Sequence, residues 1–333
     1  MWYSGSDRIT GLDTKDTELI NRGTFTMRKP YRNDKKRRIQ KKAIKEKPMT
    51  VCIAAIAEAN TKYPKIVLTA DRLVSTWVNY TSGTGKIRPL TNYCWVLIAT
   101  NNALVSEDII TKSIEKLAET SKETNEKLSV EQIVEIISVE CKRRLDAERE
   151  RFVLSPHGLT YDSYITRSKE LSREHIDIIT NNLKDFETRD YDFEVELLVV
   201  GIDAKPHIFT IFQNGQFVSY DVEGFAMVGS GKATAFPEIT KYLYHPNVNW
   251  LYALHRVYNS KRVAERVGGV GPETDLIVLH MVDNGDVTYW PADDDTKKLL
   301  DSGMEEVKKQ EVTIYTKLLE KFNNLFLSSE PKK

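Results

Sequence analysis

The sequence is poor in cysteine: it has three in 333 residues, Cys52, Cys94 and Cys141, and none of them forms a CxxC pair. So few and so widely spaced cysteines exclude a disulfide framework and are typical of a reducing compartment. The six histidines are scattered without the spacing of metal ligands. Neither a metal nor another cofactor is therefore predicted.

Long apolar runs are also missing. No stretch approaches the roughly 18–20 apolar residues that a bilayer span requires, and the N-terminus lacks the charged-then-apolar order of a signal peptide. Apolar residues make up 41% of the chain and charged residues 29%, which is an ordinary balance for a globular protein. We therefore expect a cytoplasmic protein that does not associate with membranes.

The formal net charge is zero, but it is unevenly distributed. Residues 1–48 contain 14 Lys or Arg and 6 Asp or Glu, a net charge of +8, which leaves −8 for the remainder. This segment also has little hydrophobic periodicity, so we expect a basic extension that is disordered or a propeptide, unless Met49 is the biological start. Nucleic-acid binding is not expected, because no aromatic residue interrupts the basic cluster 35–38. Residues 49–327 are assigned to a single domain and 328–333 to a tail.

Hydrophobic periodicity divides this domain into groups of strands and groups of helices. Grouped antiparallel strand pairs with helices between them predict an α+β protein in which two stacked sheets are flanked by helices. The predicted strands are 49–56, 66–72, 86–90, 94–99, 193–200, 207–212, 216–220, 225–228, 275–282 and 287–290. The predicted helices cover 105–117, 129–145 (opened by a capping box at Ser129–Gln132), 171–186, two segments ending at Ala264, and 312–322.

Two glycine-rich segments superficially resemble phosphate-binding loops. Gly83–Lys86 and Gly229–Lys232 each end in Gly-Lys, but the following residues are Ile87 and Ala233. A P-loop needs Ser or Thr after the lysine and a glycine five positions before the glycine of the Gly-Lys pair. Nucleotide binding through either segment is therefore excluded.

Three residues carry groups that could act together in catalysis: Thr50, Asp71 and Lys86. A threonine hydroxyl is a poor nucleophile unless a base takes its proton, and a free amine on the same residue can be that base. An N-terminal amine has a pKa of about 7.7–8.0, which suits a general base. A nearby ammonium would lower the proton affinity of both groups, and a carboxylate would hold it in place. On periodicity and spacing alone, a strand threonine, a turn aspartate and a surface lysine are the favoured interpretation.

Five segments occur in an order that resembles a known family: Thr50–Ile56, Thr69–Arg72, Gly85–Ile87, Val228–Gly231 and Gly269–Asp275. With these segments the chain is similar to the proteasome β-subunit and HslV family of N-terminal nucleophile (Ntn) hydrolases, particularly its bacterial and archaeal proteasome-like branch. The resemblance covers about 49–285, is interrupted by a helical insertion near 145–187, and implies a four-layer αββα sandwich.

The resemblance implies a role for each residue at the matching positions. Thr50 aligns with the nucleophile, and Asp71 and Lys86 align with its two supporting charges. Ser230 aligns with a serine that hydrogen-bonds around the amine of the nucleophile, although a turn serine that caps the following helix is the alternative. Thr100 stands where the family has the glycine of the oxyanion hole, whose backbone N–H donates to the developing charge.

Three departures from the family pattern bear on activity. Thr100 brings a β-branched side chain to a glycine position. The family's second Asp and its Ser before a Gly-Gly pair fall at Ala264 and Val267. Neither side chain can form a hydrogen bond or carry a charge, although Glu265 lies beside Ala264. A competing nucleophile, Cys52, has no support from the family and is interpreted as a buried strand residue.

The resemblance thus implies a threonine-type peptidase that hydrolyses peptide bonds of peptide or protein substrates once residues 1–49 are removed. Assembly into a homo-oligomeric ring and an ATPase partner are further implications of the family. Two alternatives stay open: a non-catalytic ring or scaffold subunit that never exposes Thr50, and an amidase that uses the same nucleophile on a small molecule.

Overall fold

The structure of the chain, a computed structural model, describes residues 50–75, 80–82, 85–100, 102–188, 194–267 and 270–328. The predictions for the basic extension 1–48 and for Met49 lie outside these residues, as does nearly all of the tail at 328–333. The described residues belong to one compact unit, which spans Glu46–Lys333.

One five-stranded sheet contains the predicted N-terminal hairpin. Its strands follow the order β10-β1-β2-β11-β12, and each neighbouring pair is antiparallel. Because β1 and β2 pair directly and consist almost entirely of buried apolar residues, the hairpin lies in the interior of the sheet. The strands are β1 (Cys52–Ala57), β2 (Lys65–Asp71), β10 (Phe225–Val228), β11 (Thr274–Met281) and β12 (Val287–Pro291).

A second five-stranded sheet follows the order β5-β6-β7-β8-β9 and is also antiparallel throughout. The predicted hairpin across Asn214-Gly215 joins β8 to β9, and Gly215 has the positive φ of +79° that such a turn needs. The strands are β5 (Ile87–Pro89), β6 (Cys94–Thr100), β7 (Val195–Ile202), β8 (Pro206–Phe212) and β9 (Phe217–Ser219); a separate hairpin pairs β3 (Leu73–Ser75) with β4 (Tyr80–Ser82).

Seven α-helices lie in the described part of the chain. The predicted capping box is present: the Ser129 hydroxyl accepts from the backbone of Gln132, and the Gln132 side chain accepts from the backbone of Ser129. The helices are α2 (Ala103–Thr124), α3 (Val130–Arg149), α4 (Tyr161–Arg167), α5 (Arg173–Thr188), α6 (Lys232–Thr240), α7 (Trp250–Ala264) and α8 (Asp294–Ser328); single turns occur at Glu150–Leu154, Ser155–His157 and Glu265–Val267.

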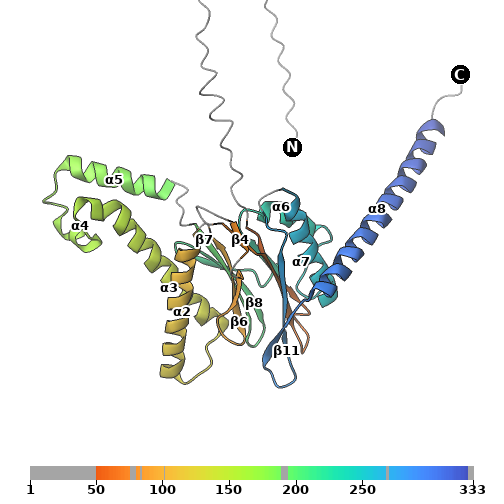
Figure 1. Ribbon diagram of the computed structural model, residues 1–333, viewed down its shortest axis with the longest axis horizontal. Coiled ribbons are helices and arrows are strands. Elements are labelled where there is room, and N and C mark those ends of the chain that lie inside the picture. The colour runs from red at the N-terminus through yellow and green to blue at the C-terminus, as the bar shows by residue number, and fades with distance from the viewer. Residues whose placement is uncertain are drawn as a thin grey trace, which may run out of the picture. The chain divides into compact units, whose positions relative to one another are not determined.

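The two sheets pack face to face, and helices cover their outer faces (Figure 1). Side chains of a strand point alternately to its two faces, and β1 shows this clearly. Cys52, Ala54 and Ile56 join the apolar core that includes β6 and β7, whereas Ile53 and Ala55 join a second core with α6 and α7. Helices α2 and α3 pack against the second sheet. The predicted α+β class with two packed antiparallel sheets is confirmed.

The helical stretch predicted near 145–187 contains α4, α5 and the two short turns before them. It has an apolar cluster of its own, which is made of Val153, Leu154, Leu159, Ile179 and Phe186. None of the helices in the described residues has both the length and the apolar character that a membrane crossing demands.

The placement of Leu97 in the main core can be tested by truncation. Leu97 is fully buried, so Leu97→Ala should lower the free energy of unfolding by about 2–5 kcal/mol. Leu299→Ala is the matched control, because Leu299 on α8 is 73% exposed and its truncation should cost less than about 0.5 kcal/mol. Urea unfolding measures both values, and equal small losses would contradict the packing.

A pH dependence of stability is expected from His207 on β8. Its Nδ1 lies 2.7 Å from Asp221 and its Nε2 lies 3.2 Å from Asp203. Burial lowers the pKa of His207, but the hydrogen bond and charge of Asp221 and the charge of Asp203 outweigh it, so that the pKa is raised. The protonated ring therefore stabilises the fold below the unfolded pKa of about 6.5, and this is lost as the pH rises through the folded pKa.

His207→Gln should remove that contribution. We expect the fall in unfolding free energy above about pH 6.5 to become shallower in this variant, as measured by urea titrations across the pH range. A pH profile identical to that of the wild type would show that His207 does not titrate in this way.

Candidate active site at Thr50

Thr50 lies just before β1, where three chain segments meet. In the antiparallel sheet Cys52 is opposite both Ala70 of β2 and Val228 of β10. The start of β1 is therefore flanked by the end of β2, at Asp71, and by the turn after β10. This topology brings together residues that lie 20 and 180 positions apart in the sequence.

Lys86 links Thr50 to Asp71. Its ammonium Nζ donates to Thr50 Oγ1 at 2.9 Å and to both carboxylate oxygens of Asp71 at 2.9 Å. Asp71 is fully buried and Lys86 is 8% exposed, so the ion pair is largely removed from water. Lys86 is thus in direct contact with both of the residues with which it was predicted to act.

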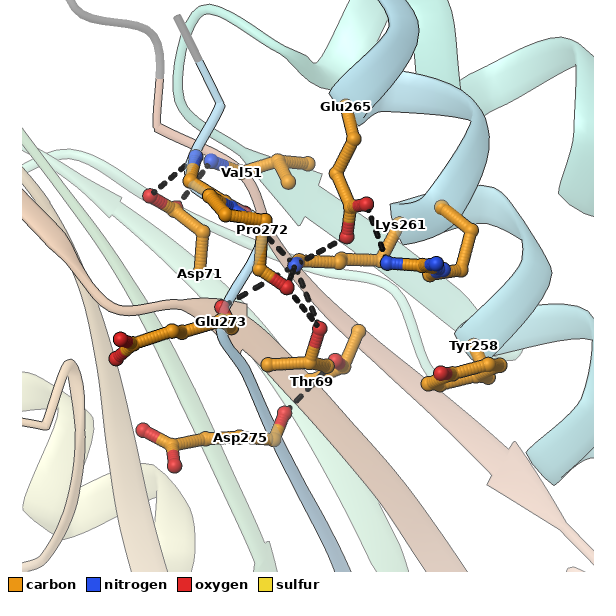
Figure 2. Close-up of polar contacts among 12 residues, drawn as sticks. Val51, Thr69, Asp71, Tyr258, Lys261, Glu265, Pro272, Glu273 and Asp275 are labelled. Carbon is orange, nitrogen blue, oxygen red and sulfur yellow. Dashed lines mark hydrogen bonds and ion pairs between the residues drawn. The ribbon is translucent and has the colours of Figure 1, made fainter. Parts of the chain in front are cut away.

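Backbone donors hold the Asp71 carboxylate from two sides. The N–H of Val51 donates to Oδ1 at 3.0 Å (Figure 2), and the N–H of Gly271 donates to Oδ2 at 3.4 Å. Each oxygen therefore receives a backbone donor in addition to the Lys86 ammonium. These contacts fix the orientation of the carboxylate.

Ser230 lies on the other side of Thr50, in the turn between β10 and α6. Its Oγ accepts from the backbone nitrogen of Thr50 at 3.3 Å, and the N–H of Gly231 donates to the carbonyl of Thr50 at 2.9 Å. The N-cap of α6 is Gly231 and not Ser230, and it makes no side-chain capping bond. The structure therefore places Ser230 beside Thr50 and not in a capping role.

Glycine is needed at position 229. Gly229 has a φ of +91°, and a Cβ at this position would lie 2.3 Å from the carbonyl oxygen of Thr50. Its N–H donates at 2.8 Å to the carboxylate of Glu196 on β7, which also pairs with Lys232 at 2.7 Å. Glu196 thus ties the Ser230 turn to the second sheet.

A surface cavity opens beside Thr50. Thr100, the residue predicted at the oxyanion position, is one of the residues that line it. The Thr100 hydroxyl donates to the carbonyl of Asn102 at 3.0 Å and accepts from the Asn102 N–H at 2.9 Å. The side chain is thus engaged at the start of α2. The cavity is lined by Thr50, Ala99, Thr100, Glu194, Glu196, Gly229, Ser230 and Lys232.

Two apolar residues, Ala264 and Val267, stand where the family that the sequence resembles has an Asp and a Ser. Neither adds a polar group to the site. Ala264 is fully buried in the apolar core under α7, and the side chain of Val267 lies outside the described part. Glu265 contacts Lys261 and pairs with Arg262 at 2.6 Å.

Cys52 is a buried strand residue, as predicted. It has no exposed surface, and its thiol donates to the carbonyl of Ile98 at 3.6 Å. Burial raises the pKa of Cys52 to about 12, an effect that the nearby Lys86 charge opposes. The neutral thiol is a poor nucleophile. Among the described residues, no three His, Cys, Asp or Glu side chains gather as metal ligands would.

Two residues near the site were missed from the sequence: Glu196 and Lys261. Glu196 interrupts the apolar run of β7, and Lys261 lies on the buried face of α7 that includes Leu254 and Val257. A charged residue on an apolar face is the signal that could have indicated both. Burial lowers the pKa of Lys261, and the hydrogen bond and charge of Glu265 oppose that shift.

No model of a known protein family matches the chain, and no curated protein matches it. Function is therefore inferred from the geometry of the site.

The close approach of Gly229 to Thr50 can be tested against a matched glycine. Gly229→Ala should destabilise the protein by more than the roughly 1–3 kcal/mol that a left-handed non-glycine residue costs, because its Cβ would also clash with the Thr50 backbone. Gly285→Ala is the control, since Gly285 has a similar φ of +82° but nothing within 4 Å of a new Cβ. Chemical denaturation compares the two, and equal losses would contradict the clash.

Proposed function

We propose that this chain is a threonine-type peptidase with the Ntn-hydrolase fold, in which Thr50 is the nucleophile. The observation that carries the proposal is the Lys86 ammonium, which lies 2.9 Å from Thr50 Oγ1 and is held there by buried Asp71. The two helix-flanked antiparallel sheets, with Thr50 just before the central strand β1, support the assignment to this fold. The ordered segments that resemble proteasome β-subunits and HslV point to the same activity.

The base in this mechanism is the amine of Thr50 itself, so the Met49–Thr50 bond has to be hydrolysed first. While that bond is intact, the Thr50 nitrogen belongs to a peptide group and has no useful basicity. Ser230 Oγ lies 3.3 Å from this nitrogen and would orient the amine once it is free. Lys86 would lower the pKa of the hydroxyl through its positive charge.

The proposed reaction has two halves. Thr50 Oγ attacks the substrate carbonyl while its proton passes to the Thr50 amine, and the tetrahedral intermediate then expels the leaving amine, which takes that proton. An ester between Thr50 Oγ and the acyl group remains. Water then attacks the ester carbonyl while its proton passes to the same amine. The bond between the acyl carbon and Thr50 Oγ breaks, Oγ takes the proton back from the amine, and the carboxylic acid leaves with Thr50 regenerated.

The backbone N–H of Thr100 is the proposed oxyanion donor, because Thr100 lines the same cavity as Thr50. The Thr100 hydroxyl is hydrogen-bonded to the backbone of Asn102 and not to the proposed nucleophile. A homo-oligomeric ring and an ATPase partner are further parts of the proposal, and they follow from the resemblance alone. A cytoplasmic location is also part of the proposal, and it follows from the few and widely spaced cysteines.

A non-catalytic subunit of a ring or scaffold is the second candidate. It is favoured by the buried apolar Ala264 at the position of the family's second aspartate. In that case Met49 stays attached and the Lys86–Asp71 pair only stabilises the fold. An amidase for small molecules would share the nucleophile and differ in its substrate.

The proposal is tested by mass spectrometry and peptide turnover. We expect the purified protein to begin at Thr50 and to hydrolyse peptides, and Thr50→Ala to abolish turnover because no oxygen nucleophile remains. Thr240→Ala, a distant threonine on α6, should leave turnover unchanged. A chain that retains Met49, or turnover that survives Thr50→Ala, would contradict the peptidase. Hydrolysis restricted to small amides would indicate the amidase.

Lys86 gives a second, graded test in the chain that begins at Thr50. Lys86→Met should lower kcat by about 10²–10³-fold, as expected when one preorganised electrostatic group is removed. Lys62→Met is the matched control, because the Lys62 side chain is 67% exposed and pairs with Asp283, which is not a residue of the site. Equal kcat values for the two variants would contradict the role of Lys86.

A further inference from the structure

Lys261 is a fully buried lysine that the proposed mechanism does not use. Its ammonium lies among five acceptors at the C-terminal end of α7 (Figure 2). These are the carbonyls of Gly271 at 2.8 Å, Pro272 at 3.3 Å and Glu273 at 3.2 Å, the Thr274 hydroxyl at 2.6 Å, and the Glu265 carboxylate.

Three of these acceptors are consecutive backbone carbonyls. Each is a strong acceptor, and leaving it unpaired in the interior would cost free energy. The Lys261 ammonium lies within hydrogen-bonding distance of all three carbonyls and shares its three N–H donors among them, the Thr274 hydroxyl and Glu265. The path of segment 271–273 therefore depends on the position of Lys261. Segment 271–274 is defined here as the Lys261-bound segment.

The Lys261-bound segment is in direct contact with Asp71. The N–H of Gly271 donates to Asp71 Oδ2 at 3.4 Å, and the carbonyl of Glu273 accepts from the N–H of Arg72 at 3.2 Å. Thr274 is also the strand partner of Asp71 in the pairing of β11 with β2. One segment thus contacts the Lys261 ammonium on one side and the Asp71 carboxylate on the other.

We propose that Lys261 is a positioning residue for the site at Thr50, and that it acts on Asp71 through the Lys261-bound segment. When Lys261 is lost, the three carbonyls separate and Gly271 withdraws its N–H from Asp71 Oδ2. The carboxylate then turns, and the ammonium of Lys86 moves away from Thr50 Oγ1. The consequence for catalysis rests on the proposed function, whereas the effect on Asp71 does not.

The buried Arg256 offers a matched control on the same helix. Arg256 is 3% exposed and pairs with Glu238 at 3.0 Å, and its guanidinium lies over the ring of Tyr242. Arg256→Met, like Lys261→Met, removes a buried cation of α7 and leaves a carboxylate behind. Only Lys261 contacts the segment on Asp71, so the two variants separate positioning from a general loss of stability.

The first measurement is amide hydrogen exchange by NMR on the full chain, and it does not require activity. The amides of Gly271 and Val51 both donate to Asp71. We expect Lys261→Met to accelerate the exchange of both by at least about 10-fold, because local opening exposes them, while Arg256→Met leaves both near the wild-type rates. Unchanged exchange of Val51 in Lys261→Met would overturn the proposal.

The second measurement is steady-state peptide hydrolysis by the form that shows Thr50-dependent turnover. Lys261→Met should lower kcat by about 10–100-fold with little change in KM, since misplacement of a catalytic group by about 1 Å costs this much. Arg256→Met should retain wild-type kcat. Faster exchange at Val51 with an unchanged kcat would overturn the link from Lys261 to the reaction.

Failure of the proposed function can be distinguished from failure of the proposed role of Lys261. Absence of Thr50-dependent turnover in the wild type would refute the proposed function, and the exchange rates alone would then decide whether Lys261 positions Asp71. If Lys261→Met does not fold, Thr274→Val takes its place, because it removes one acceptor from the ammonium and keeps the β-branched shape. It should accelerate exchange at Gly271 and Val51 in the same direction, and wild-type rates would overturn the proposal.

Discussion

The site depends on one buried ion pair, between Lys86 and Asp71. Removing two charges from water is costly, and their attraction repays the cost only where geometry is good and the remaining lone pairs are satisfied. Here Lys86 contacts both oxygens of Asp71 at 2.9 Å, and the backbone N–H groups of Val51 and Gly271 donate further hydrogen bonds to the same two oxygens. The third contact of the ammonium, to Thr50 Oγ1, is therefore fixed by the same arrangement.

Antiparallel pairing explains why these groups meet at the ends of neighbouring strands in the sheet. The start of β1 has to lie beside the ends of β2 and β10, so Thr50 is flanked by Asp71 and by the Ser230 turn. Lys86 comes from the second sheet, immediately before β5, and reaches Asp71 because the two sheets face each other. The packing of two sheets is thus a requirement of the site as well as of stability.

Local patterns in the sequence were enough to predict much of this arrangement. The apolar runs of β1 and β2, the Asn214-Gly215 turn and the capping box at Ser129 each carry a short-range signal, and the structure contains all of them. The contacts of Lys261 could not be predicted in the same way. They depend on how segment 271–274 crosses the end of α7, and the sequence shows there only a lysine at an apolar helix position. The hydroxyl of Thr100 is a similar case, since its engagement by Asn102 depends on the local path of the chain before α2.

Thr50 is already in place while its nitrogen is part of a peptide group. Its Oγ1 contacts the Lys86 ammonium, its nitrogen donates to Ser230 and its carbonyl accepts from Gly231. Under the proposed function, cutting the Met49–Thr50 bond therefore supplies a base and needs no rearrangement of the groups around the nucleophile. Preorganised groups of this kind lower a reaction barrier because no reorganisation is needed when the charge develops. Under the proposed function, the same preorganisation carries a constraint: a residue that holds Asp71 through segment 271–274 would also act on Thr50.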